Sequence, residues 1–448
     1  MKQLKTGFAR IEINPPMGID IAGYFKVRKA EGILDNLEAN AVAISCDQKT
    51  VLLIAVDHCG LVKAILDGYK QAISETTGIS VDAIYIHSTH THTGPVLLPD
   101  SKDELIMAYR KTLCEKLAVV AKYALLDLKP AKMGYGVGQA PNIAFIRRYK
   151  MKDGSTRTNP GVNNPDIVAP IGEVDERVNV LRFDREGAES VVIVNFGDHP
   201  DTVGGNLISG DWPNFTRKFV EQSIDNTKCI FFNGAQGDVN HVNVHPTAGD
   251  FNDMFNDFDG CSRGYGHARH MGRVVAGAVM QVYDKVNYVD VDSIDYVQKI
   301  VEIPSNKPDP KDLPLAHKYN DLHNAGKDDE IPFKAMMLTT VVAEAARMVR
   351  LENAPDTFPM LFSAIRLGKI AFFGIPGEPF TGVGRALKET EGYDLILPTC
   401  NTNAKEGYFP MRDAYLEGGY EARGSNYKEG VAEKIIEEGQ KILRDLLK

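Results

Sequence analysis

The sequence predicts an α/β fold in which mixed β-sheets are flanked by α-helices. Short apolar segments rich in valine, isoleucine and phenylalanine recur along the chain, which is typical of strands, and longer segments with helical spacing of apolar residues lie between them. Several apolar segments run directly into polar loops that contain glycine, as strands do in α/β enzymes. Because there is no internal repeat, low-complexity segment or clear linker, residues 1–448 are predicted to form one large domain.

The composition is that of an ordinary globular protein and excludes several classes. Hydrophobic residues make up 43% and charged residues 25% of the 448 residues, which is sufficient for a large core. The net charge of -9 argues against nucleic acid as a partner, because phosphate binding needs a basic surface. No apolar run approaches the roughly 20 residues of a membrane helix, and no signal peptide is visible. We therefore expect no membrane insertion and a cytoplasmic location.

The first third of the chain is predicted to contain four strands and two helices. A polar turn at Asp47-Gln48-Lys49 separates two apolar segments, which indicates a pair of adjacent strands. Further along, Leu113 and Leu117 keep to one face of a long amphipathic segment, which indicates a helix. The expected strands are residues 5–15, 39–45, 51–56 and 83–86, and the expected helices are residues 63–77 and 103–126.

The remaining two thirds repeat this alternation. Glu186-Gly187 marks the turn between another pair of strands. The basic segment 142–157 is interpreted as a solvated loop, 247–264 as a loop, 304–327 as a connecting region and 399–427 as irregular. The other expected strands are residues 133–137, 178–183, 190–196, 229–232, 289–303, 361–367 and 369–375, and the other expected helices are residues 213–223, 264–282, 331–353, 381–389 and 430–447.

The segment from Ala83 to Pro95 concentrates the side chains that carry chemistry. Its apolar strand ends at His87, and His90 and His92 follow before a Gly-Pro turn. In extended backbone His90 and His92 project to the same side, because side-chain direction alternates along a strand. Imidazole is a common zinc ligand, and a strand end holds a ligand rigidly. This spacing therefore predicts a metal or catalytic site.

Other strand ends carry side chains of the same kind. Their histidines, aspartates and glutamate match a metal site with nitrogen and oxygen ligands and an open position. His267 and His270, three residues apart on an expected helix, are interpreted instead as a pair on the helix surface. The strand-end segments are Asp57-His58, Asp198-His199-Pro200, Gly237-Asp238-Val239-Asn240 and Gly377-Glu378.

With these motifs the chain resembles the catalytic N-terminal domain of the neutral/alkaline, non-lysosomal ceramidases over nearly its whole length. The order of the His-Thr-His-Thr-Gly-Pro and Pro-Gly-Glu elements is the most specific part of the resemblance. The matching segments are Asn14-Pro15-Pro16, Gly23-Tyr24, Thr89 to Pro95, Asp198-His199-Pro200, Ser209-Gly210-Asp211, Gly237-Asp238-Val239, Pro376-Gly377-Glu378 and the stretch from Tyr408 to Tyr427.

The resemblance implies one zinc ion and a set of ligands for it. In the family the ligands are the first histidine of His-x-His, a distant histidine, the glutamate of Pro-Gly-Glu and a tyrosine near the C-terminal end of the catalytic domain. These correspond to His90, His199, Glu378 and Tyr408 of this chain. The expected cofactor is therefore Zn²⁺.

The resemblance also implies residues beside the reacting centre. The second histidine of the motif is His92, and a second tyrosine twelve residues after the ligand is Tyr420. The arginine near the substrate amide corresponds to Arg147, with Arg148 as the alternative. Ceramidases carry a serine where this chain has Asn240, which cannot supply a hydroxyl. The chain also ends soon after the segment that matches the catalytic domain, so we expect it to lack the C-terminal β-sandwich domain of full-length ceramidases.

The leading hypothesis is a zinc-dependent hydrolase that acts on an amide or ester-like bond of a small polar substrate. Zinc lowers the pKa of its water to about 7, so the metal could supply the nucleophile without the serine. His92 would move protons or hold the oxyanion, and Asn240 would hydrogen-bond the substrate. The alternatives are a metal-binding sensor that has lost catalysis, and a non-hydrolytic metal enzyme such as a lyase.

Overall fold

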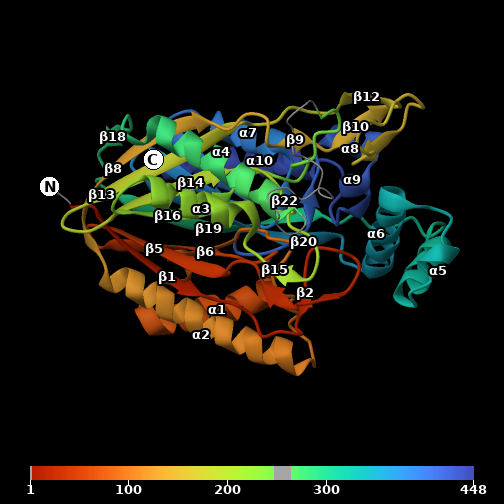
Figure 1. The fold of residues 1–448 in the computed structure, drawn as a ribbon, viewed down its shortest axis with the longest axis horizontal. Helices are drawn as coiled ribbons and strands as arrows, with labels where there is room; N and C mark the ends of the chain where they lie inside the picture. The colour runs from red at the N-terminus through yellow and green to blue at the C-terminus, as the bar shows by residue number, and fades with distance from the viewer. Residues whose placement is uncertain (1–2, 247–263) are drawn as a thin grey trace.

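The structure, a computed structural model of the chain, describes residues 3–246 and 264–448. Two β-sheets pack face to face, and helices cover their outer faces (Figure 1). The larger sheet has the strand order β16-β14-β13-β8-β1-β5-β6-β7, with β18 paired to β8. Its strands are β1 (Lys5–Glu12), β5 (Glu38–Cys46), β6 (Lys49–Val56), β7 (Ile84–Ser88), β8 (Lys129–Gln139), β13 (Arg177–Arg185), β14 (Ser190–Phe196), β16 (Thr227–Asn233) and β18 (Asn287–Val289).

The smaller sheet has the order β19-β20-β21-β23. Both sheets are mixed, because β6 and β7, β14 and β16, and β21 and β23 are parallel pairs while most other neighbours are antiparallel. This confirms the predicted α/β class with mixed sheets. The strands of the smaller sheet are β19 (Ile294–Pro304), β20 (Thr357–Leu367), β21 (Ile370–Gly374) and β23 (Leu395–Thr399).

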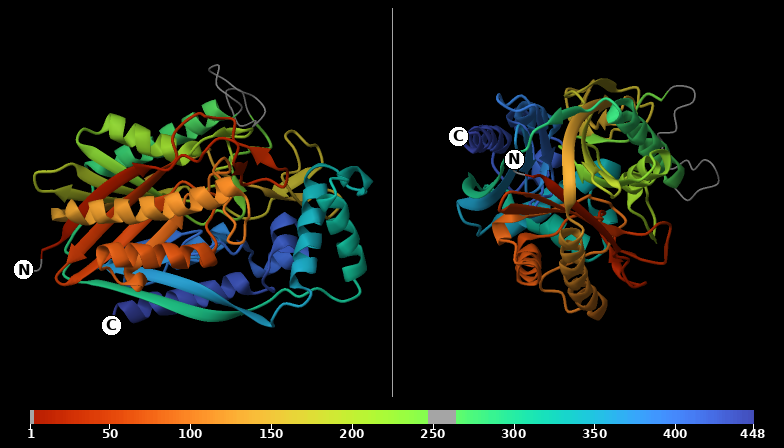
Figure 2. Two further views of the ribbon diagram at one scale, coloured as in Figure 1. Left: turned by 90° about the horizontal axis from the view of Figure 1, so that it is seen from below. Right: turned by 90° about the vertical axis from the view of Figure 1, so that its left-hand side faces the viewer.

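The helices lie on three sides of the two sheets. Seen end-on in Figure 2 (right), the orange helices α1 and α2, the green α3 and α4 and the blue α10 surround the strands. Asp103 begins α2 by accepting hydrogen bonds from the backbone N–H groups of Leu105 and Ile106. The helices are α1 (Lys63–Thr77), α2 (Glu104–Leu126), α3 (Asp211–Ser223), α4 (Tyr265–Tyr283), α5 (Leu313–Asn324), α6 (Ala335–Leu351), α7 (Thr381–Lys388), α8 (Arg412–Glu417), α9 (Tyr420–Gly424) and α10 (Val431–Leu446).

Adjacent residues of the central strands belong to different hydrophobic cores. In β6, Leu53 packs toward the smaller sheet with Phe372 of β21, whereas Leu52 packs toward α1 and α2. Because side chains alternate along a strand, both faces of the sheet are buried and the strand reads as a continuous apolar run. Burial of each such leucine or phenylalanine stabilises the fold by about 1.5–3 kcal/mol. None of the described helices is long and apolar enough to cross a bilayer.

Three sequence interpretations are wrong. Residues 399–427, interpreted as irregular, contain the short helices α8 and α9. The basic segment 142–157 is not a solvated loop, since it forms three short strands and its Arg147 and Arg148 are buried. Residues 304–327 contain the helix α5, which pairs with α6 to form an arm at one end of the molecule (Figure 2, left). The expected loop 247–264 lies almost entirely outside the described residues.

Short strands form smaller pairings outside the two main sheets. They are β2 (Asp20–Ile21), β3 (Arg28–Lys29), β4 (Gly32–Ile33), β9 (Phe145–Ile146), β10 (Arg148–Met151), β11 (Thr156–Thr158), β12 (Ile167–Pro170), β15 (Leu207–Ile208), β17 (Val239–Asn240), β22 (Glu378–Pro379) and β24 (Tyr408–Phe409).

Candidate metal centre

The segments that follow β7, β14 and β21 bring His90, His199 and Glu378 together. Within the described ranges these residues form a group whose donor atoms all lie within 4.8 Å of one another. The carboxylate Oε2 of Glu378 is 3.3 Å from His90 Nε2 and 3.1 Å from His199 Nε2. All three side chains are buried. Two imidazole nitrogens and a carboxylate oxygen are thus aimed at one point, as metal ligands are.

Backbone carbonyls hold the two imidazole rings in the orientation that ligation requires. Nδ1 of His90 lies 2.5 Å from the carbonyl oxygen of Cys59, and Nδ1 of His199 lies 2.8 Å from that of Gln236. With the proton on Nδ1, each ring presents an unprotonated Nε2 to the centre. Histidines that bind metals usually donate their other ring N–H in this way, to a backbone carbonyl or a carboxylate. The buried His199 Nε2 and Glu378 Oε2 have no hydrogen-bond partner in this structure, as expected of atoms that ligate a metal.

The protonation states of the group also suit a cation. Burial lowers the pKa of His199 to about 3, and the positive charge of Arg147 acts in the same direction. Burial likewise lowers the pKa of His90. Burial alone would raise the pKa of Glu378, but its contacts with the two histidines hold that pKa well below the usual range. At neutral pH the site therefore offers two neutral imidazoles and one carboxylate, the forms that bind metals.

A buried ion pair fixes the loop that presents His90. Arg217 donates to both carboxylate oxygens of Asp57, at 3.0 and 2.6 Å, and Asp57 in turn accepts a hydrogen bond from the Thr89 hydroxyl at 3.1 Å. The next residue, His90, has a φ of 78° and donates its backbone N–H to the His58 carbonyl. A left-handed conformation is uncommon for residues other than glycine and recurs at functional sites, where the surrounding structure maintains it.

The predicted fourth ligand, Tyr408, lies beside the other three. Strands β22 and β24 form a parallel pair in which Glu378 is directly opposite Tyr408. The Tyr408 ring stacks near His199, with centroids 6.4 Å apart, and meets Tyr420 edge to face at 5.5 Å. Burial, followed by the negative charge of Glu378, raises the pKa of Tyr408 well above its usual value. A divalent cation here would oppose that shift, because it favours the phenolate.

Arg147, not Arg148, is the arginine that faces this group. Its guanidinium lies 5.4 Å from the centre of the Tyr408 ring, and its Nε is 2.7 Å from the buried carboxylate of Glu421. Arg148 instead pairs with Glu417 at 3.0 Å and lies 4.0 Å from the other carboxylate oxygen of Glu421. The pairing of Arg147 with Glu421 could not be predicted from the sequence, because the contact joins segments that are distant in the chain.

His92 belongs to a second set of contacts that sequence reasoning also missed. Its Nε2 is 3.2 Å from His90 Nε2, and its Nδ1 is 3.3 Å from the carboxylate of Asp201. Tyr24 donates its hydroxyl to the same carboxylate, and Arg28 donates to the His92 carbonyl at 2.6 Å. His92 therefore has one nitrogen toward the candidate centre and the other toward an acid, as catalytic histidines have. In the sequence, the only indication of a role for Asp201 is its position directly after the Asp198-His199-Pro200 segment.

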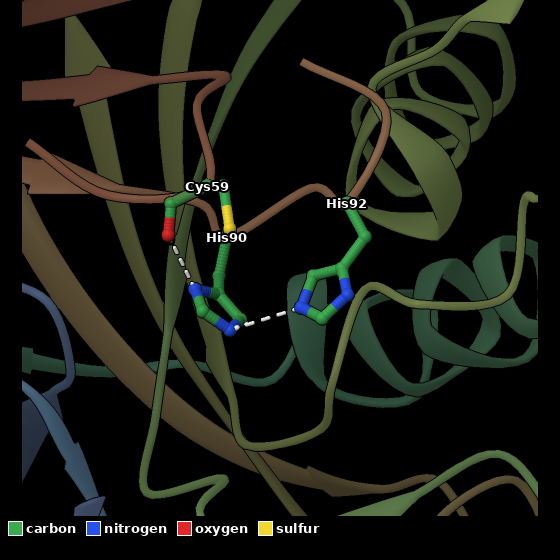
Figure 3. A group of neighbouring side chains, drawn as sticks. All are labelled: Cys59, His90 and His92. Carbon is green, nitrogen blue, oxygen red and sulfur yellow. Dashed lines mark hydrogen bonds between the residues drawn. The ribbon is translucent and has the colours of Figure 1, made fainter. Parts of the chain in front are cut away.

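Figure 3 shows the second group of potential ligands, Cys59, His90 and His92, whose donor atoms also lie within 4.8 Å of one another. The Cys59 thiol lies close to His90, while the Cys59 carbonyl holds the His90 ring. Cys59 is buried, so its thiol lies inside the protein beside these histidines. The scattered cysteines of the sequence gave no indication of it.

Asn240, His267 and His270 were also singled out in the sequence, and they do not belong to the donor groups of the described residues. Asn240 is buried in β17, where its side chain donates to Asn159 at 2.9 Å and accepts from the backbone of Val242 at 3.1 Å. The preceding residue, Val239, holds the His199 ring through its carbonyl. Of the expected surface pair on α4, His270 is exposed but His267 is buried, and neither belongs to the two donor groups of the described residues.

The fold is the α/β fold of neutral ceramidase structures, and the group of donors lies inside it. The chain resembles the crystal structure of neutral ceramidase from Pseudomonas aeruginosa, with a TM-score of 0.72 and 16% sequence identity over 98% of this chain and 74% of that one. It also resembles a ceramidase complexed with C2, with a TM-score of 0.73 and 16% identity over 99% and 76% of the two chains. No family model and no curated protein matches the sequence. The resemblance predicted from sequence is thus confirmed at the level of the fold, for a divergent chain.

Replacing Tyr408 with phenylalanine tests the fourth ligand. If the phenolate oxygen ligates the metal, Tyr408→Phe should weaken zinc binding by at least about tenfold, since even groups around the ligands have effects of that size. The fold should persist, because the ring and its stacking remain. Competition with a chromophoric chelator measures the affinity. Tyr393→Phe is the matched control, with unchanged affinity expected, because the Tyr393 hydroxyl donates to the Leu443 carbonyl and touches none of the candidate ligands. Equal affinity in Tyr408→Phe and the wild type would leave the metal with three protein ligands.

Proposed function

We propose that this protein is a zinc-dependent hydrolase that cleaves an amide or ester-like bond of a small polar substrate. The observation that carries the proposal is the convergence of His90 Nε2, His199 Nε2 and Glu378 Oε2 on one point. Two of these buried atoms have no hydrogen-bond partner, so the donor set fits a cation. His90, His199 and Glu378 would hold Zn²⁺ together with Tyr408, a set of nitrogen and oxygen ligands that zinc accepts.

When bound, zinc would polarise a carbonyl group and make water a better nucleophile at neutral pH. Asp201 would keep the proton of His92 on Nδ1, so that Nε2 can take a proton from the attacking group and return it to the leaving group. Arg147 places a positive charge next to Tyr408, where it would orient a polarised carbonyl oxygen. Asn240 would hydrogen-bond the substrate, and because it has no hydroxyl it cannot form an acyl-enzyme at that position.

Turnover of N-acyl and ester compounds in ¹⁸O-labelled water tests the proposal. We expect the zinc-loaded protein to hydrolyse members of such a panel, to place one solvent oxygen in the acid product and to lose activity with a chelator. Product formed without solvent oxygen would indicate a lyase instead of a hydrolase. Zinc binding without turnover of any compound would favour a sensor.

Long-chain ceramide belongs in the panel as a comparison. We expect little or no release of sphingosine from it, because Asn240 replaces the serine found in ceramidases. Robust sphingosine release by the purified chain would show that this substitution does not exclude ceramide.

A further inference from the structure

A lysine with an incomplete set of partners lies beside the candidate metal centre. Nζ of Lys405 is 3.5 Å from Cys59 Sγ, and that sulfur lies within 4.8 Å of donor nitrogens of His90 and His92. Lys405 is on the segment between β23 and Tyr408, the predicted fourth ligand. Its half-buried side chain therefore places a charge at the edge of the site.

The contacts of Lys405 do not satisfy its ammonium group. An ammonium has three N–H donors, and the single hydrogen bond that the structure gives this one is to a thiol sulfur, which is a weak acceptor. The ordinary pKa of a lysine ammonium is about 10.4, so the group is positively charged at neutral pH. A partly buried charge without an anion is costly, and such charges are normally paired.

Other cations near the centre are already engaged by the protein. Arg147 pairs with the carboxylate of Glu421 at 2.7 Å. Arg28 donates to backbone carbonyls, including those of Gly205 at 2.7 Å and His92 at 2.6 Å. Lys405 differs from both, because among the described residues no carboxylate oxygen lies within salt-bridge distance of its Nζ.

The backbone holds the lysine in place. Gly60 has a φ of +147°, and a Cβ built on it would lie 2.3 Å from Cδ of Lys405. The stem of the lysine thus passes directly over the backbone of Gly60, where only glycine leaves room for it. A side chain confined in this way loses little additional freedom when it binds a ligand, which favours binding.

We propose that Lys405 binds a carboxylate of the substrate, so that the natural substrate is a small N-acylated or esterified acid. This rests on the proposed hydrolase function and names its substrate class. One ammonium with two unused donors matches a monoanionic carboxylate, whereas a phosphate dianion usually receives an arginine fork or several donors. The carboxylate would sit near Cys59 while the scissile carbonyl faces the metal ligands.

Calorimetric titration of the zinc-loaded full chain tests the proposal with two probes, N-acetylglycine and N-acetylglycinamide, which differ only in the carboxylate. We expect the wild type to bind N-acetylglycine about ten- to a hundredfold more tightly, the usual effect of a charged hydrogen bond. Lys405→Met keeps the stem over Gly60 and should remove this preference without changing zinc content. Lys405→Arg should keep part of it, and Lys428→Met, which removes an exposed lysine, should keep all of it.

The outcomes separate this inference from the function on which it rests. Equal affinity of the wild type for the two probes would overturn it, as would a preference that persists in Lys405→Met because the carboxylate binds the zinc directly. Hydrolysis of neutral amides with no carboxylate preference would leave the hydrolase standing and remove Lys405 from substrate recognition. Lys405-dependent binding of N-acetylglycine without turnover of any compound would retain the anion site and count against the hydrolase.

Discussion

Replacing His90 with asparagine is expected to reduce bound zinc from about one ion per chain to a small fraction, because one of the few protein ligands is lost. Asparagine tolerates the left-handed backbone that this position requires, so the variant should fold. Turnover should fall to the level of the chelated wild type. Elemental analysis of purified protein measures the metal, and circular dichroism checks the fold.

His317→Asn is the matched control for this experiment. His317 is an exposed histidine on α5 that pairs with Glu352 at 3.0 Å, and its loss should change neither zinc content nor activity. Full zinc occupancy in His90→Asn would remove His90 from the site, and with it the convergence of three donors on which the proposed function depends.

Replacing Asp201 with asparagine is expected to lower kcat/KM by roughly a hundredfold or more, the range of general acid–base catalysis. Burial alone would raise the pKa of Asp201, but its contact with His92 and its hydrogen bonds hold that pKa well below the usual range, so the group is a carboxylate. An amide can present its N–H₂ to His92 and favour the wrong tautomer of the ring. Zinc content should be unchanged, and the pH profile of kcat/KM should shift.

The effect of Asp201 can be separated from general disruption of the loop. Tyr24→Phe removes the hydroxyl that donates to the same carboxylate but keeps the acid beside His92. We expect this variant to retain most of the activity. If Asp201→Asn and Tyr24→Phe lose activity equally, the acid holds the loop together and does not orient His92.

The sequence predicted the α/β class and several positions of the candidate site, because both depend on local patterns. Strand ends carrying His90, His199 and Glu378 could be recognised one at a time, and the structure places them together. The burial of Arg147 could not be predicted, because a basic segment is usually solvated and its partner Glu421 lies far along the chain. The position of Lys405 beside Cys59 is a tertiary contact of the same kind.

The two packed sheets were also beyond local reasoning. Periodicity identifies a strand with one buried face, whereas β6 has both faces buried and gives only an apolar run. The helix α5 was missed because prolines and polar residues precede its start, which favoured a connecting region. Its pairing with α6, which buries Ala316, supplies the stability that its weak local pattern does not indicate.

The candidate metal ligands come from segments that are far apart in the chain, so they are synthesised at different times. His90 and His199 emerge from the ribosome on the order of ten seconds before Glu378 and Tyr408, given ordinary rates of elongation. Until β22 and β24 pair, the two histidines of the candidate site are present, but Glu378 and Tyr408 are not held side by side. Under the proposed function, zinc capture at full affinity would therefore follow the pairing of these two strands, and a chain interrupted before residue 378 would compete poorly for the metal.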